Sequence, residues 1–327
     1  MIKAGIVGGA GYTAGELMRV LVHHPLTEVS FVHSNSHAGH PIWKVHNDLA
    51  GDTDMLFTDE LCETDVVFLC LGHGKAIEYL NTNRFPGHPK IIDLSQDFRI
   101  NPFFQAQNGS CWEFVYGLPE YHREQIRTAS YIANPGCFAT ALELALLPLA
   151  KAGLLTDGVH INGITGSTGA GQALSATTHF SWRNNNISIY NPFTHRHLLE
   201  VRKILETAAG SAVPELNFIP VRGDFTRGIF LSAYTENHLG IIELQDIYRQ
   251  YYADAAFTIV CDREISLKDV VGTNKCFLLV EKHGNKTLIT SVIDNLLKGA
   301  SGQAVQNMNL MFGIEEKTGL GLKGVRF

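Results

Sequence analysis

Residues 3–15 read KAGIVGGAGYTAG, and this segment decides the fold of the first part of the chain. Its first five residues form a short apolar strand, the next eight a glycine-rich turn, and residues 16–22 continue with the spacing of an amphipathic helix. Glycines in such a turn let the backbone bend tightly and approach a pyrophosphate, which then lies at the helix N-terminus. The segment therefore predicts the first unit of a Rossmann-type, dinucleotide-binding domain.

The second predicted strand, residues 28–32, leads into the polar segment 33–37, where such domains select their cofactor. Domains that prefer NAD usually carry an acidic residue here, which binds the ribose 2′-hydroxyl. This segment has hydroxyls and histidines instead, which suit a 2′-phosphate, although a polar loop without a cofactor role is the alternative. We therefore expect NADP, bound by Gly8, Gly11, Tyr12, Thr13, Ser34 and Ser36.

Two further strands are predicted over residues 64–71 and 90–95. The first is a nearly continuous apolar run, typical of a parallel strand that is covered on both faces. Ser95 and Arg99 follow the second strand, at the end where ligands collect in parallel sheets, and together they suit a phosphate or carboxylate. The spacing alone favours the other interpretation, a structural arginine paired with Asp97.

Residues 134–140 read NPGCFAT and lie between two apolar runs. The run before them predicts a buried strand, the run after them a buried helix, and Pro135 and Gly136 mark the turn. Cys137 is therefore expected at the start of the helix, where free N–H groups and the positive end of the helix dipole favour a thiolate. A thiolate is a good nucleophile at neutral pH, whereas the alternative interpretation is a small buried apolar residue.

The pattern changes after residue 153. A second glycine turn, residues 166–171, either wraps a phosphate or is a plain turn. Small residues at 299–302 precede an amphipathic helix, which we expect to pack back onto the first domain. One helix is predicted over 240–252, and the alternation of apolar residues predicts a mixed, largely antiparallel sheet in an α+β region, with strands at 159–165, 216–221, 228–236, 257–261, 276–282 and 286–293.

Residues 195–197 read HRH, between Thr194 as a candidate helix cap and a helix predicted from Leu198. A histidine at the start of a helix is well placed to transfer protons. His-x-His also occurs in metal sites, but no third ligand accompanies it, so the pattern predicts no metal.

Composition limits the class of protein. The 327 residues suffice for two domains, and 45% hydrophobic and 18% charged residues are globular values. A formal net charge of -6 argues against nucleic acid or an anionic membrane as the main partner. Six cysteines without paired spacing indicate neither disulfides nor zinc. No signal peptide or bilayer-spanning run is evident, so we expect a cytoplasmic protein.

Taken in order, these segments resemble the N-acetyl-gamma-glutamyl-phosphate reductases, relatives of aspartate-semialdehyde dehydrogenase. The similarity runs nearly end to end and is most specific at residues 8–17, 93–99, 116–120, 134–140, 166–171, 195–197 and 294–313. It implies that Cys137 is the nucleophile and that His195 is the acid/base, with His197 as the second candidate. The chain departs from the family at Asn35, where an arginine commonly follows Ser34, and at Leu198-Leu199, where a Thr-Pro or similar pair is more usual.

The resemblance also implies an architecture and a reaction. Residues 1–136 form an NADP-binding Rossmann domain completed by the C-terminal helix 302–327, and residues 137–301 form the catalytic and oligomerisation domain of a dimer or tetramer. NADPH reduces N-acetyl-glutamyl 5-phosphate to the 5-semialdehyde through a cysteine thioester, in arginine biosynthesis. Substrate-binding candidates are Ser95, Arg99 and His197. An aspartate-semialdehyde dehydrogenase and a non-catalytic NADP sensor are the alternatives, and the sequence leaves acetyl and succinyl groups equally open.

Overall fold

The computed structural model describes residues 1–106, 109 and 111–325, and the chain divides into two compact units. Unit 1 comprises Met1–Pro135 and Ala300–Gly321, and unit 2 comprises Gly136–Gly299 with the segment that follows Gly321. Among the described residues, no helix is both long enough and apolar enough to cross a bilayer.

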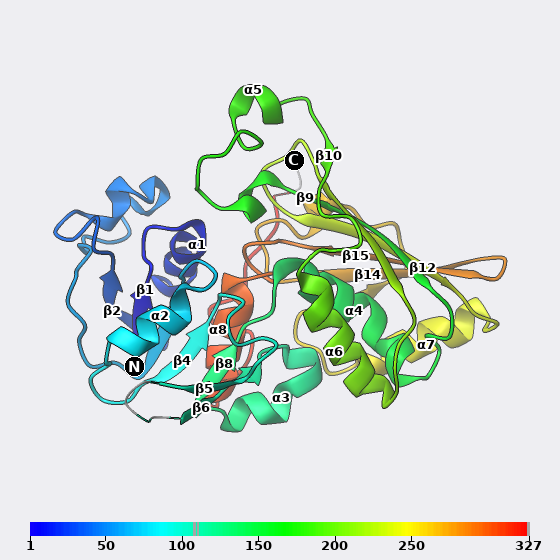
Figure 1. Ribbon diagram of the computed structural model, residues 1–327, viewed down its shortest axis with the longest axis horizontal. Helices are drawn as coiled ribbons and strands as arrows, with labels where there is room; N and C mark the ends of the chain where they lie inside the picture. The colour runs from blue at the N-terminus through cyan, green and yellow to red at the C-terminus, as the bar shows by residue number, and fades with distance from the viewer. Residues whose placement is uncertain (107–108, 110, 326–327) are drawn as a thin grey trace. The chain divides into compact units, whose positions relative to one another are not determined.

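Unit 1 is built on a six-stranded sheet in which every neighbouring pair runs parallel (Figure 1). All four residues of its third strand are buried, as a strand covered on both faces requires. The predicted Rossmann-type sheet is therefore confirmed. Its strands, in spatial order, are β2 (Thr27–His33), β1 (Ile2–Val7), β3 (Val66–Leu69), β4 (Lys90–Asp93), β8 (Tyr131–Ala133) and β7 (Val115–Tyr116).

The remaining elements of unit 1 are helices and one small hairpin. The helices are α1 (Tyr12–Leu21), α2 (Lys75–Thr82), α3 (Pro119–Thr128) and α8 (Ser301–Met311), with short 3₁₀ turns η1 (Ile42–Lys44) and η2 (Asn47–Leu49). The hairpin pairs β5 (Phe103–Gln105) with β6 (Cys111–Glu113).

Helix α8 is buried on every side, although its sequence predicts an amphipathic helix. Its amide side chains find partners inside unit 1, which is why they tolerate burial. Asn307 Nδ2 donates to the Gly117 carbonyl at 2.9 Å, and Asn309 Oδ1 lies 3.1 Å from His24 Nε2. Ser301 Oγ donates to the Thr13 carbonyl at 2.7 Å, which ties α8 to the first turn of α1.

Unit 2 contains a seven-stranded sheet with four antiparallel and two parallel pairs, as predicted. Along its strand Val159–Thr165, buried and exposed residues alternate at the first five positions. In spatial order the strands are β10 (Ser188–Ile189), β11 (Leu216–Arg222), β9 (Val159–Thr165), β12 (Ile229–Glu236), β15 (Lys286–Ile293), β14 (Cys276–His283) and β13 (Thr258–Cys261).

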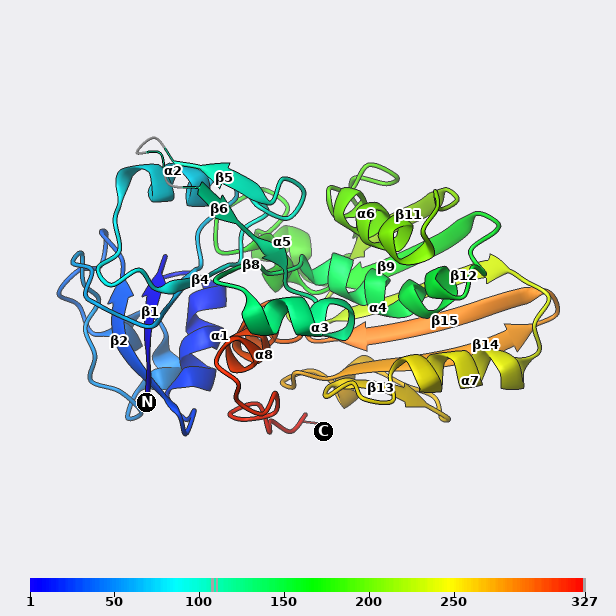
Figure 2. The same ribbon diagram turned by 90° about the horizontal axis from the view of Figure 1, so that it is seen from below.

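Three helices lie along one face of this sheet (Figure 2): α4 (Cys137–Lys151), α6 (His197–Ala209) and α7 (Ile241–Tyr251). The two phenol hydroxyls of Tyr248 and Tyr252 each donate to a carbonyl of α4 at 2.6 Å, so the middle helix is held in a fixed position. The other elements of unit 2 are α5 (Phe180–Arg183), η3 (Ser167–Ala170) and η4 (Leu267–Asp269).

Candidate active site

Cys137 is the first residue of α4, and Gly136 is its N-cap in an extended conformation. The predicted passage from strand to turn to helix is therefore confirmed, with β8 ending at Ala133. No acidic residue lies in the first turn of α4, so no side chain of that turn offsets the positive end of the helix dipole. The half-buried thiol thus lies where a thiolate is favoured.

An aromatic ring fixes this first turn against the sheet. The Phe138 ring lies edge-on to Phe218, with 5.1 Å between ring centroids. A methyl group on Gly163 of β9 would come within 2.5 Å of Phe138 Cε1, so the ring occupies the space that any side chain at position 163 would need. The packing of the Phe138 ring against Gly163 and Phe218 therefore fixes the start of α4, which carries Cys137.

The structure places His195 in the same cluster. Its ring centroid lies 5.6 Å from those of Phe138 and Phe218, and 4.7 Å from that of His197. Burial, and then the charge of Arg196, lower the pKa of His195 to about 4. Its Nδ1 accepts the backbone N–H of His197 at 3.3 Å. Neutral His195 therefore carries its proton on Nε2 and is a hydrogen-bond donor from that atom.

Tyr190 connects Cys137 with His195. Its ring centroid lies 5.7 Å from that of His195, and the Arg222 guanidinium carbon lies 4.8 Å from the centroid of the Tyr190 ring. The pKa of Tyr190 is raised chiefly by burial and then by the charge of Cys137. Tyr190 could not be predicted as a site residue, because a single tyrosine ahead of the HRH motif carries no local signal in the sequence.

His197 and Glu200 form a buried pair at the start of α6, with Nε2 and Oε1 3.8 Å apart. The other carboxylate oxygen, Glu200 Oε2, accepts the Gly136 N–H at 3.2 Å. Glu200 therefore connects the second histidine of the HRH motif with the N-cap of α4. Glu200 was not predicted as a site residue, and the sequence signal that could have indicated it is its three-residue spacing from His197 on one helix.

The prediction that Thr194 caps this helix is wrong. Helix α6 begins at His197 with Arg196 as its N-cap residue, and no side chain caps it. The Thr194 hydroxyl instead donates to the Pro192 carbonyl at 3.4 Å.

The glycine turn of unit 1 leads into α1 through a tight bend. Gly8 has φ +82°, and a Cβ there would lie 2.5 Å from the Cys70 carbonyl oxygen. A Cβ on Gly11, the N-cap of α1, would meet only the Gly8 oxygen at 3.8 Å, so the helix N-terminus is open to close approach. With Tyr12 and Thr13 at the start of α1 and no acidic residue in its first turn, the turn fits an anion.

Ser34 and Ser36 lie just past the carboxyl end of β2, with both hydroxyls near one imidazole. Ser34 Oγ is 3.3 Å and Ser36 Oγ 2.9 Å from His37 Nδ1. Two hydroxyls and an imidazole are donors that suit a ribose phosphate, and their role in binding the cofactor stays a prediction.

Ser95 and Arg99 are both buried and make structural hydrogen bonds. Ser95 Oγ donates to Asp93 at 2.7 Å, and burial raises the pKa of that carboxyl to about 7 despite this bond. Arg99 donates to the carbonyls of Asn134 at 2.8 Å and Leu94 at 3.0 Å. Arg99 thus supports the segment that precedes the cysteine turn, while substrate binding by Ser95 and Arg99 stays a prediction.

The fold and the site around Cys137 and His195 are those of a class of enzymes, the semialdehyde dehydrogenases. The family model for their NAD-binding domain matches residues 3–129, and that for their dimerisation domain matches residues 137–295. A crystal structure of aspartate semialdehyde dehydrogenase II from Vibrio cholerae has the same fold, with a TM-score of 0.71 at 15% identity over 96% of this chain and 98% of that one.

Relatives that are much more similar identify the particular family. The N-acetyl-gamma-glutamyl-phosphate reductase of Christiangramia forsetii is 56% identical over the full length of both chains. That of Flavobacterium johnsoniae is 54% identical over 99% of each chain. The chain belongs to the N-acetyl-gamma-glutamyl-phosphate reductase family.

Proposed function

We propose that the protein reduces N-acetyl-glutamyl 5-phosphate to N-acetyl-glutamate 5-semialdehyde and phosphate with NADPH, in arginine biosynthesis. The observation that carries this proposal is Cys137 at the start of α4, with His195 packed against the ring of the next residue, Phe138, and Tyr190 beside His195. Relatives named N-acetyl-gamma-glutamyl-phosphate reductase, at 51–56% identity, support the same substrate. Aspartate-semialdehyde dehydrogenases resemble the chain in fold alone.

Cys137 acts in the first step as the nucleophile. Its thiolate attacks the acyl carbon, a carbon–sulfur bond forms, and the carbon–oxygen bond to phosphate breaks, with phosphate leaving with the electron pair. The start of α4 stabilises the thiolate before the attack, because the helix dipole favours an anion at this position.

His195 acts on the oxygen of the thioester. Bound NADPH supplies the hydride that reduces the thioester carbon. Negative charge then develops on the carbonyl oxygen, and neutral His195 stabilises it with a hydrogen bond from Nε2. The charge returns to sulfur when the carbon–sulfur bond breaks, so Cys137 leaves as a thiolate and the semialdehyde is released. His197, paired with Glu200, is the second candidate for this role.

We assign cofactor binding to unit 1 and catalysis to unit 2. The open N-terminus of α1 suits the pyrophosphate, and the hydroxyls of Ser34 and Ser36 suit the 2′-phosphate of NADP. The matched dimerisation domain supports a homo-oligomer of two or four subunits. Six cysteines that form no disulfide support a cytoplasmic location, because thiols remain reduced there.

Replacing Cys137 tests the proposal. The assay follows phosphate-dependent NADP reduction with N-acetyl-glutamate semialdehyde, and compares the N-succinyl and aspartate semialdehydes. Cys137→Ser should lose at least ~10³-fold in kcat, since it removes the thiolate, while NADP binding measured by calorimetry is retained. Cys261→Ser, at another half-buried free cysteine of unit 2, is the matched control. Full turnover by Cys137→Ser, or none by the wild type, contradicts the proposal.

A further inference from the structure

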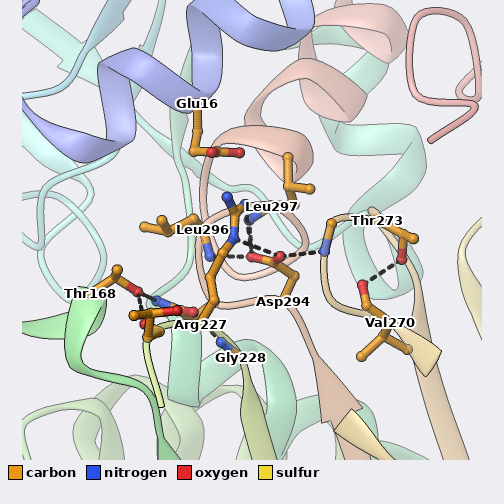
Figure 3. Close-up of polar contacts among 12 residues, drawn as sticks. Glu16, Thr168, Arg227, Gly228, Val270, Thr273, Asp294, Leu296 and Leu297 are labelled. Atoms are coloured by element: carbon orange, nitrogen blue, oxygen red, sulfur yellow. Dashed lines mark hydrogen bonds and ion pairs between the residues drawn. The ribbon is translucent and has the colours of Figure 1, made fainter. Parts of the chain in front are cut away.

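A tight turn follows β15 and is organised by one carboxylate. Asp294 is fully buried, and its Oδ1 accepts the N–H groups of Leu296 and Leu297 at 2.8 and 3.1 Å (Figure 3). Its Oδ2 accepts the Gly272 N–H at 2.7 Å and pairs with Arg227 Nε at 2.9 Å. A buried anion with this many donors is well compensated, so the turn from 294 to 299 is rigid.

The next side chain holds the turn from the other side. Asn295 Oδ1 accepts the Gly228 N–H at 2.6 Å, and its Nδ2 donates to Thr168 Oγ1 at 3.0 Å. Thr168 in turn donates to the Thr226 carbonyl at 2.6 Å. The second glycine turn, residues 166–171, which the sequence offers as a possible phosphate site, is therefore hydrogen-bonded to the 294–299 turn through the side chains of Asn295 and Thr168.

The far end of the turn contacts the candidate nucleophile. The Gly299 N–H donates to the Asp294 carbonyl at 2.9 Å, which closes the turn. A methyl group on Gly299 would lie 2.8 Å from Cys137 Cβ and 2.7 Å from the Asn295 carbonyl oxygen. The turn backbone is thus packed directly against the carbon that carries the sulfur.

We propose that Asp294 is a positioning residue for Cys137, acting through the backbone of Gly299. Its carboxylate fixes the turn, and the turn restricts where the Cys137 side chain can lie. The proposal rests on the proposed function of Cys137 as nucleophile. Asp294 and Gly299 take no part in the chemistry. Substitutions at these two positions are therefore expected to change kcat and the reactivity of the Cys137 thiol more than the KM for the substrate.

Two substitutions disturb the turn by different means. Asp294→Asn places an amide NH₂ against backbone N–H donors, so that donor faces donor in a buried site. Gly299→Ala removes no side-chain hydrogen-bonding group of the turn, and its methyl group presses on Cys137 Cβ and on the Asn295 carbonyl oxygen. Asp269→Asn is the matched control, because Asp269 also accepts a backbone N–H, that of Ser266 at 2.8 Å, and pairs with Arg263.

The readout is the rate of Cys137 alkylation by iodoacetamide across pH, followed by mass spectrometry of the proteolytic peptide that contains Cys137, because the exposed Cys62 and Cys111 also react. The kcat, KM, NADP affinity and melting temperature are measured on the same variants. We expect alkylation and kcat to fall together, by roughly 10- to 100-fold as displacements near 1 Å do, in folded Asp294→Asn and Gly299→Ala. Asp269→Asn should change neither. Alkylation profiles like that of the wild type in folded Gly299→Ala overturn the proposal, even if Asp294→Asn fails to fold. Alkylation needs no turnover, so this outcome is separate from that of Cys137→Ser.

Discussion

Glu200 offers the sharpest test of how the candidate active site is assembled. Its carboxylate accepts the Gly136 N–H at 3.2 Å and lies 3.8 Å from His197 Nε2. Glu200→Ala removes both interactions, whereas Glu200→Gln keeps an oxygen for Gly136 but loses the charge that faces His197. The two variants therefore separate support of the nucleophile from support of the histidine.

The size of the effect follows from burial. Glu200 is 4% exposed, so the Gly136 N–H gains no water when its acceptor is removed. A hydrogen bond to a charged group contributes about 1.5–3 kcal/mol. If the loss falls on the transition state, kcat for Glu200→Ala drops roughly 10- to 150-fold, because each 1.36 kcal/mol is a factor of about ten. Glu200→Gln should keep the melting temperature and lose less activity.

The assay is phosphate-dependent NADP reduction at saturating semialdehyde, with melting temperature and NADP affinity measured on the same samples. Glu206→Gln is the control, since Glu206 lies on the same helix but pairs with Arg202 at the surface. Turnover of Glu200→Ala within twofold of the wild type would refute the reasoning, because the Gly136 bond would then contribute nothing to the nucleophile.

Two further predictions concern His195 and Gly8. The pKa of His195 is about 4 in the folded protein and 6.5 in the unfolded chain. The free energy of unfolding therefore keeps the full contribution of neutral His195 above pH 6.5 and loses it, by up to about 3 kcal/mol, as the pH falls to 4. His195→Asn should reduce this acid destabilisation in denaturant titrations across pH; parallel curves would contradict it. Gly8→Ala should weaken NADP binding at least ~10-fold through strain at φ +82° and the clash with Cys70, whereas Gly51→Ala, at φ +95° with open space, should leave affinity unchanged in calorimetry.

The sequence predicts the sheets well because their signals are local. The continuous apolar run of β3 indicates a strand covered on both faces, and the alternation along β12 indicates one covered face. The hairpin of β5 and β6 was missed, since three-residue strands carry no period. The all-round burial of α8 was also missed, because its asparagines and glutamines look solvent-facing until distant partners such as Gly117 are known.

In the candidate site, too, residues with a local sequence signal could be predicted and residues defined by distant partners could not. The position of Cys137 at the start of α4 could be predicted, because the proline–glycine turn and both apolar runs are contiguous. Glu200 and Asp294 could not be predicted, since their partners Gly136 and Arg227 lie 64 and 67 residues away along the chain. A carboxylate that organises backbone groups across such a separation has no pattern of its own in the sequence.

The contact between Phe138 and Gly163 limits how this enzyme can be redesigned. Enlarging a binding site usually begins by trimming side chains around the reactive atom. Beneath the Phe138 ring there is no side chain to trim, because position 163 already carries only hydrogen, and the ring itself packs against Phe218. Variant libraries designed to accept bulkier acyl groups therefore have to keep Phe138 and Gly163 and vary other residues around the site.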